Sequence, residues 1–285
     1  MTQNPQVRLS VSGLIASVEP DRFVDGGMQL VVDGTPQSHV NTAEPRELFF
    51  EYIQRMGHVI DEIGREGEPI TAVHLGAGAL TLPRYIEATR PGSRQQVVEL
   101  ERELVDLVRE TIPWDRRANI RVRYGDAREV LDRLPAGLHG SADLVVVDIF
   151  SGARTPAHVT STEFYALAAR LLAPEGIIVV NVADGAGLRF ARGQAATLRG
   201  VVSEVAALAE TQVLKGRRFG NVVLIGSNAP LPLDYIPRLL ASGPHPAKAV
   251  SGEEMDDFIG RALPVSDETA IPSPPPGRNV FQVRG

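Results

Sequence analysis

The sequence predicts a doubly wound α/β fold, in which a mostly parallel β-sheet carries helices on both faces. From residue 70 onward, short runs of branched apolar residues alternate with segments of helical periodicity. The run 144–148 has the uninterrupted apolar character that a parallel strand buried on both faces requires. Strand–helix alternation over this length favours right-handed crossovers and a parallel sheet. With 285 residues and 43% hydrophobic content, the chain suffices for one large domain with a small addition.

The N-terminal residues 1–44 predict a small β unit, because an apolar run at 28–33 ends in the turn signal Asp33-Gly34. An apolar stripe at spacings of three and four then predicts a helix over 45–65. The later elements are expected in alternation, with strands at 70–75, 95–99, 119–124, 144–148 and 176–181 and helices at about 80–90, 101–111, 161–172 and 192–209.

The last part of the domain predicts two successive strands within 211–226, joined near 216–220, which would form an antiparallel hairpin at the sheet edge. Such a hairpin resembles class I methyltransferase-type sheets more than dehydrogenase sheets. We expect the α/β domain to cover 45–263. Residues 264–285 form a Pro-rich tail that cannot hold a helix or a central strand, so we expect it to be disordered or extended.

Composition narrows the function classes. The chain has no cysteine, which excludes disulfides and thiolate chemistry and fits a cytoplasmic location. Its net charge of −6 argues against nucleic-acid binding. We find neither a secretion signal nor an apolar run of membrane-spanning length. The six histidines form no ligand pair at helical spacing, so no metal site is expected.

Residues at three strand ends predict a nucleoside site. Gly76 and Gly78 lie where the first strand of the domain turns into a helix, and glycine there lets the backbone approach a ligand. Glu99 ends the second strand, where a carboxylate can accept bonds from both ribose hydroxyls. Asp126, followed by Ala127, comes just after the third strand and can accept the adenine amino group.

Each of these residues also has a purely structural explanation. The glycines can serve a tight turn, Glu99 can favour a helix dipole, and Asp126 can cap the next helix. Asp126 can do both, because a carboxylate has two oxygens. Thr81 stands at the third-glycine position of the dinucleotide fingerprint, which favours a nucleoside-binding transferase over a dehydrogenase.

Six short segments in order resemble the spermidine synthase family, the polyamine aminopropyltransferases. They are the D-G-x-x-Q of 33–37, the helix start at 47–52, the glycine loop at 76–80, the V-E-L-E of 98–101, the G-D-A of 125–127, and the segment 147–152 followed by E-F-Y at 163–165. The resemblance implies decarboxylated S-adenosylmethionine as co-substrate, an amine acceptor, and methylthioadenosine as product. It also implies a homodimer formed through the N-terminal strands.

By the same resemblance, Gln37, Glu99 and Asp126 would hold the nucleoside, and Asp148 would face the reacting centre. The second aspartate of the family's D-S-x-D-P segment is Ser151 here, so Ser151 is the other candidate catalytic residue.

Further departures concern the acceptor. The glycine loop carries Ala79-Leu80-Thr81 where an acid usually binds the aminopropyl ammonium, and Phe50 replaces a tyrosine at the helix start. Basic residues at 215, 217 and 218 stand near the position of another family tyrosine. If these bases point inward, the acceptor is neutral or anionic, because like charges would repel a diamine. Otherwise they form a solvated hairpin tip.

Three functions therefore stay open: aminopropyl transfer, methyl transfer from intact S-adenosylmethionine, and a non-catalytic nucleoside-binding or scaffold role. Two further polar residues carry alternatives. His158 is either a base near neutral pH or an exposed loop histidine. Asp184 either replaces a lost acid at the site or caps the next helix.

Overall fold

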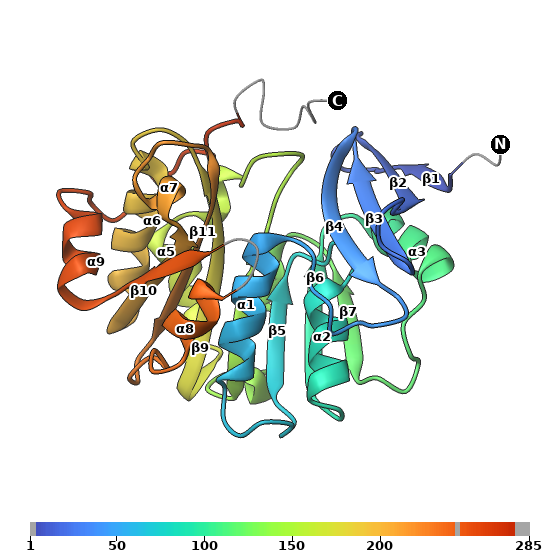
Figure 1. Cartoon of the computed structure of the whole chain (residues 1–285), viewed down its shortest axis with the longest axis horizontal. Coiled ribbons are helices and arrows are strands. Elements are labelled where there is room, and N and C mark those ends of the chain that lie inside the picture. Colours follow the sequence, from blue (N-terminus) through green and yellow to red (C-terminus); the bar gives the residue numbers. More distant parts are fainter. Residues whose placement is uncertain (1–3, 243–245, 277–285) are drawn as a thin grey trace.

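The computed structural model describes residues 4–242 and 246–276. It contains two sheets, and the larger has eight strands in the order β12-β10-β11-β9-β8-β5-β6-β7 (Figure 1). Five of them, β5 to β9, run parallel to one another, and β10, β11 and β12 pair antiparallel with their neighbours. These strands are β5 (Thr71–Leu75), β6 (Arg94–Glu99), β7 (Ile120–Tyr124), β8 (Ala142–Val147), β9 (Leu172–Asp184), β10 (Glu204–Glu210), β11 (Gly220–Ser227) and β12 (Ala247–Val250). The predicted mostly parallel sheet with an antiparallel hairpin near one edge is confirmed.

Helices cover both faces of this sheet, as strand–helix alternation predicts. One face packs on α4 (Ala127–Asp132), α5 (Thr162–Ala169), α6 (Arg189–Arg199) and α9 (Gly252–Ile259). The other packs on α1 (Glu51–Asp61), α2 (Thr81–Thr89) and α8 (Ile236–Ala241). Apolar residues alternate along the central strands, so that Val145 belongs to the first core and Val146 to the second. Among the described residues no helix is long and apolar enough to cross a membrane.

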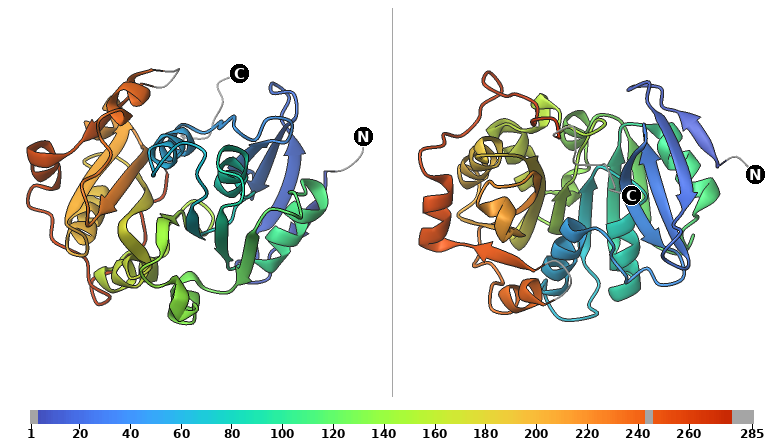
Figure 2. Two further views of the ribbon diagram at one scale, coloured as in Figure 1. Left: turned by 90° about the horizontal axis from the view of Figure 1, so that it is seen from below. Right: turned by 45° about the horizontal axis from the view of Figure 1, so that its top comes forward.

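The N-terminal residues form a separate four-stranded antiparallel sheet in the order β1-β2-β3-β4. Its strands are β1 (Gln6–Arg8), β2 (Ile15–Pro20), β3 (Gly27–Val32) and β4 (Thr35–Asn41). Asp33 and Gly34 both have positive φ in the β3–β4 turn, the conformation that this pair predicts for a tight hairpin. The sheet packs on α3 (Arg102–Thr111) through a third apolar cluster (Figure 2). It therefore stands beside the carboxyl ends of β5 and β6.

The last third of the chain corrects two sequence predictions. The helix expected over 192–209 ends at Arg199, and Gly200 to Ser203 lead into β10. The hairpin is made by β10 and β11, while Thr211–Leu214 forms the short helix α7 rather than a strand. The helix-forming composition of 204–210 yields to burial, because this strand lies between β11 and β12.

The Pro-rich tail, expected to be disordered or extended, follows a defined course over its first part. Residues 264–276 contain no helix or strand, turn at 267–269, and lie against the domain through specific hydrogen bonds. Ser273 is fully buried there. The remaining tail residues, 277–285, lie outside the described part of the chain.

Candidate functional site

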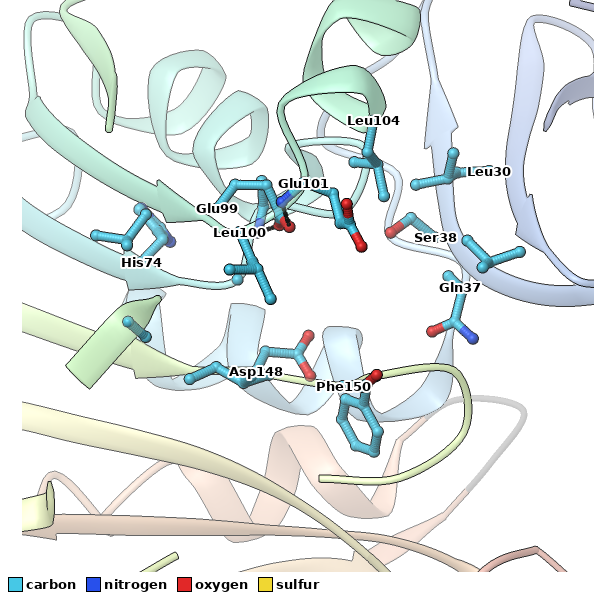
Figure 3. A pocket seen from close by; sticks show the side chains of 18 of the residues that line it. Leu30, Gln37, Ser38, His74, Glu99, Leu100, Glu101, Leu104, Asp148 and Phe150 are labelled. Carbon is cyan, nitrogen blue, oxygen red and sulfur yellow. Dashed lines mark hydrogen bonds between the residues drawn. The ribbon is translucent and has the colours of Figure 1, made fainter. Parts of the chain in front are cut away.

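A cavity of about 280 Å³ opens at the carboxyl ends of the parallel strands, between the large sheet and the N-terminal sheet. Sequential strands turn into helices at this edge, so the polar residues at the ends of β5, β6, β7 and β8 meet there. All eight residues predicted for the site line this one cavity: Gln37, Gly76, Gly78, Glu99, Asp126, Ala127, Asp148 and Ser151. In Figure 3, Glu99, Asp148 and Gln37 surround the same open space.

The glycine loop after β5 is closely packed between the backbone of Asp148 and the N-terminal sheet. Gly76 has φ of +98°, and a Cβ there would collide with the backbone carbonyl of Asp148. Gly78 has φ of +49°, and its Cβ would collide with the Ser38 hydroxyl of the N-terminal sheet. Both glycines are therefore required by a positive φ and a close approach, independently of any ligand. The same close approach leaves the loop backbone open towards the cavity.

Glu99 ends β6 with its carboxylate turned towards this loop. It accepts hydrogen bonds from the backbone N–H of Ala77 at 2.9 Å and of Glu101 at 3.0 Å. Burial raises the pKa of Glu99 above its ordinary value, although these backbone donors act in the opposite direction. The donors hold the carboxylate in place and leave it acceptor capacity for a ligand.

Asp126 serves its predicted structural role as the N-cap of α4. Its Oδ1 accepts bonds from the backbone N–H of Arg128 at 2.9 Å and of Glu129 at 3.3 Å. Its Oδ2 lies 2.6 Å from Nε2 of His158. His158 is thus a half-exposed loop residue whose ring contacts the proposed base-binding carboxylate, a pairing that no sequence signal indicated.

Asp148 comes directly after β8, in the middle of the cavity edge. Its Oδ1 accepts a bond from Nδ2 of Asn181 at 2.8 Å, and the Tyr52 hydroxyl donates to the same carboxylate. Oδ1 of Asn181 in turn accepts from Nδ2 of Asn221 at 2.9 Å. Burial raises the pKa of Asp148 to about 6, against the lowering effect of the Asn181 and Tyr52 bonds.

Tyr52 and Asn181 are site residues that the sequence reasoning did not single out. Tyr52 belongs to the apolar stripe of α1 and so passes for a core aromatic. Asn181 offered a signal, because it is a polar residue inside the buried run of β9. A polar side chain in such a strand needs a partner, and Asp148 supplies it.

The loop after Asp148 forms one wall of the cavity. Ser151 is exposed, lines the cavity, and pairs with Arg154 through backbone bonds in both directions. Nε2 of Gln37 donates to the carbonyl of Gly152 at 3.0 Å, which ties this loop to the N-terminal sheet. This bond uses Nε2 of Gln37, and the residue still lines the cavity.

The basic residues near the hairpin do not enter the cavity. Lys215, Arg217 and Arg218 are exposed and absent from the cavity lining. Arg218 lies 2.9 Å from Glu210 and 3.6 Å from Glu51. The alternative of an exposed tip thus describes them, and the condition for their repelling a diamine, that they point inward, is not met.

Asp184 has the structural role that was its alternative, at the start of α6. Its oxygens accept from the backbone N–H of Gly185 and Ala191 at the start of α6. It does not line the cavity, so it does not replace a lost acid there.

The cavity carries negative charge. Four carboxylates line it, from Glu99, Glu101, Asp126 and Asp148, and no Lys or Arg is among its described lining residues. Glu101 is satisfied by the backbone N–H groups of Val11 and Ser12, at 3.0 and 2.7 Å. His74 is buried, and burial lowers its pKa to about 4, so it is neutral at physiological pH. Such a lining suits a ligand with hydroxyl groups and positive charge.

No group of three or more His, Cys, Asp or Glu side chains suited to a metal ion occurs in residues 4–242 and 246–276.

The strand order and the position of the cavity define a Rossmann-like protein of the class I methyltransferase type. No protein-family model matches the chain. Among solved structures, a probable spermidine synthase from Corynebacterium glutamicum has a TM-score of 0.82 and 29% identity, covering 99% of this chain and 100% of that one. Spermidine synthase from Thermotoga maritima has the same fold, with a TM-score of 0.59 and 13% identity over 94% of this chain and 81% of that one.

Two curated proteins match in sequence. A polyamine aminopropyltransferase of Vibrio vulnificus is 28% identical over 139 residues, which are 48% of this chain and 45% of that protein. A probable polyamine aminopropyl transferase of Bifidobacterium longum is 32% identical over 120 residues, or 41% of this chain and 26% of that protein. The matches span less than half the length of either relative. In sequence and in structure, the chain is similar to spermidine synthases and polyamine aminopropyltransferases.

Proposed function

We propose that this protein binds decarboxylated S-adenosylmethionine and transfers its aminopropyl group to an amine, releasing methylthioadenosine. The observation that carries the proposal is the charge of the cavity, whose four carboxylates and lack of Lys and Arg among the described lining residues suit a cationic sulfonium nucleoside. The similarity to a probable spermidine synthase over nearly the whole chain supports the same reaction.

The nucleoside would lie across neighbouring strand ends. Glu99 accepts bonds from the ribose hydroxyls, because its carboxylate is held at the end of β6 beside the glycine loop. Asp126 accepts the base amino group through Oδ2, while Oδ1 stays on the helix cap. The loop of Gly76 and Gly78 and the start of α4 at Ala127 give the base and sugar a close backbone surface.

In the transfer step, the neutral amine nitrogen forms a bond to the propyl carbon attached to sulfur. The carbon–sulfur bond breaks and its electron pair stays on sulfur, so the sulfonium becomes a neutral thioether. Asp148 accepts the proton that the amine must lose, and its raised pKa makes it a better base than an ordinary carboxylate. Asn181 and Tyr52 hold this carboxylate in one orientation. Ser151 offers the amine a neutral acceptor at the cavity wall.

The decarboxylated co-substrate is favoured over intact S-adenosylmethionine. The two differ by one carboxylate, which would enter a cavity that already carries four carboxylates and has no Lys or Arg among its described lining residues to pair with it. The charge of the cavity therefore favours aminopropyl transfer over methyl transfer.

Calorimetry with methylthioadenosine, decarboxylated S-adenosylmethionine and S-adenosylhomocysteine tests the proposal. We expect the first two to bind at least about tenfold more tightly than the third, a difference of about 1.4 kcal/mol. Preference for S-adenosylhomocysteine would support methyl transfer, and no binding by the folded protein would support a scaffold role. A panel of amines, with chromatographic detection of methylthioadenosine, then identifies the acceptor. Asp148→Asn should bind methylthioadenosine and fail to transfer.

A homodimer formed through the N-terminal sheet and a cytoplasmic location stay predictions. Phe23, between β2 and β3 of that sheet, is 96% exposed and offers a position at which to test this surface. Sedimentation of the wild type and of Phe23→Ser at micromolar concentration measures whether this sheet joins subunits.

A further inference from the structure

The C-terminal segment 264–276 is hydrogen-bonded to the loop that forms the cavity wall. We propose that this segment, called the strap here, is a positioning element for the nucleobase end of the cavity, with Asp267 and Ser273 as its two positioning residues. The inference rests on the proposed function, because it assigns the strap to nucleoside binding.

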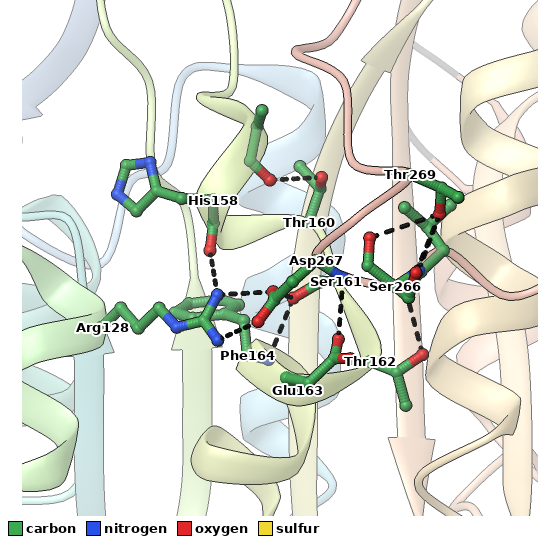
Figure 4. Close-up of polar contacts among 12 residues, drawn as sticks. Arg128, His158, Thr160, Ser161, Thr162, Glu163, Phe164, Ser266, Asp267 and Thr269 are labelled. Atoms are coloured by element: carbon green, nitrogen blue, oxygen red, sulfur yellow. Dashed lines mark hydrogen bonds and ion pairs between the residues drawn. The ribbon is translucent and has the colours of Figure 1, made fainter.

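The first attachment is an ion pair with the helix that carries Asp126. The two carboxylate oxygens of Asp267 accept from the guanidinium of Arg128 at 2.6 and 2.5 Å, in a bidentate pair (Figure 4). Asp267 also accepts from the Ser161 hydroxyl at 2.5 Å, and its backbone N–H donates to Glu163. The bonds from Arg128 and Ser161 lower the pKa of Asp267 to about 2, so the pair is charged at every working pH.

Arg128 also contacts two residues at the end of the cavity where the nucleobase is proposed to bind, Asp126 and His158. Its guanidinium donates to the carbonyl of His158 at 3.1 Å, and its backbone N–H donates to Oδ1 of Asp126 at 2.9 Å. The ring of His158 in turn contacts Oδ2 of the same aspartate. The strap therefore fixes, through one arginine, both the proposed base-binding carboxylate and the loop residue that contacts it.

The second attachment lies further along the same loop. The hydroxyl of Ser273 accepts from the backbone N–H of Thr155 at 2.8 Å, and the backbone N–H of Ser273 donates to the carbonyl of Thr155 at 3.0 Å. The Ser273 carbonyl accepts from Nε of Arg154 at 2.6 Å. Pro156, next to Thr155, lines the cavity.

The composition of the strap explains why it stays in place. In the run 272–276, proline occupies every position except 273, so Ser273 has the single backbone N–H of the run, and that N–H is used on the loop. Proline restricts the free segment to extended conformations, which reduces the entropy lost when it docks. A docked strap in turn reduces the cost of ordering the loop when a ligand binds.

Two single variants, Asp267→Asn and Ser273→Ala, and their combination test the proposal. Asp256→Asn and Ser242→Ala are matched controls, because Asp256 pairs with Arg199 between α9 and α6 and Ser242 bonds within the end of α8, both outside the cavity lining. Hydrogen exchange without ligand measures how fast the backbone amides of the loop 149–161 exchange. Calorimetry measures the Kd of methylthioadenosine.

We expect the two strap variants to speed exchange in 149–161 several-fold and to raise the Kd for methylthioadenosine about tenfold in the double variant, as loss of ordering of a few side chains implies. The KM of the nucleoside should rise while the KM of the acceptor stays constant, and the controls should change neither. Unchanged exchange in the single and double variants, or faster exchange with an unchanged Kd, would overturn the proposal.

Failure of the proposed function is a separate result. If the wild type binds no S-adenosyl nucleoside, that function fails, and the assignment of the strap to nucleoside binding fails with it. The exchange arm still shows whether the strap orders the loop. If the wild type binds and the double variant binds equally well, only the strap proposal fails.

Discussion

Replacing Asn181 by leucine should make the reaction depend on pH in a way that identifies Asp148 as its base. Asn181 donates to Asp148 at 2.8 Å, and the pKa of Asp148 is already raised to about 6 by burial. Asp148 is an acid with a raised pKa, so its ionised form is present above about pH 6 and is lost as the pH falls through that value. A hydrogen bond to a charged group contributes about 1.5–3 kcal/mol, and its loss raises the pKa by about one to two.

The acid limb of the Asn181→Leu profile should therefore lie at about pH 7–8, one to two above that of the wild type. At pH 7 the variant would retain between about a tenth and a half of the wild-type rate, and near pH 9 almost all of it. The assay is methylthioadenosine release between pH 5 and 9.5, written as the ratio of variant to wild type. This ratio cancels the titration of the acceptor amine itself.

A ratio that stays constant across this pH range would refute the reasoning, because Asn181 would then act other than through the proton on Asp148. Asn228→Leu is the matched control, since Asn228 is exposed. Within the described part of the chain, its amide oxygen accepts hydrogen bonds only from Ser203. Carboxyl-carbon NMR of protein labelled at aspartate follows the pKa of Asp148 without turnover. The raised pKa also means that this carboxyl favours folding at acid pH, a contribution lost as the pH rises from 3.8 to about 6.

Three further variants test the rest of the site. Asp126→Asn keeps an oxygen for the cap of α4 but loses the charge. The binding free energy of methylthioadenosine should therefore weaken by about 1.5–3 kcal/mol, seen as a higher Kd, while the melting temperature stays nearly constant. An unchanged Kd removes Asp126 from the site. Gly76→Ala should lose at least about 2 kcal/mol more unfolding free energy than Gly67→Ala, because both have positive φ but only Gly76 meets a backbone carbonyl; equal denaturant midpoints would contradict this. Glu101→Gln should speed hydrogen exchange at 9–14, where it holds the N–H groups of Val11 and Ser12, and unaltered exchange there would speak against this tether.

Much of the local structure is set by composition and periodicity. The turn at Asp33-Gly34, the strands at the centre of the sheet and the N-cap at Asp126 depend on residues close in sequence. The helix predicted over 192–209 is wrong from residue 204 onward, because alanine, leucine and glutamate favour a helix when no neighbour is considered. A signal was present in Gly200, which ends α6 at its C-cap, but only the neighbouring strands make the segment after it a strand.

The sequence by itself determined the order of elements and placed Glu99, Asp126 and Asp148 at successive strand ends. Parallel strands bring their carboxyl ends to one edge, so this much of the site is a consequence of topology. Only the tertiary structure decided which polar groups hold these acids, since Asn181, Tyr52 and His158 reach them from other elements. It also placed the proline segment on the loop, because contacts between residues more than a hundred positions apart depend on packing that no local pattern encodes.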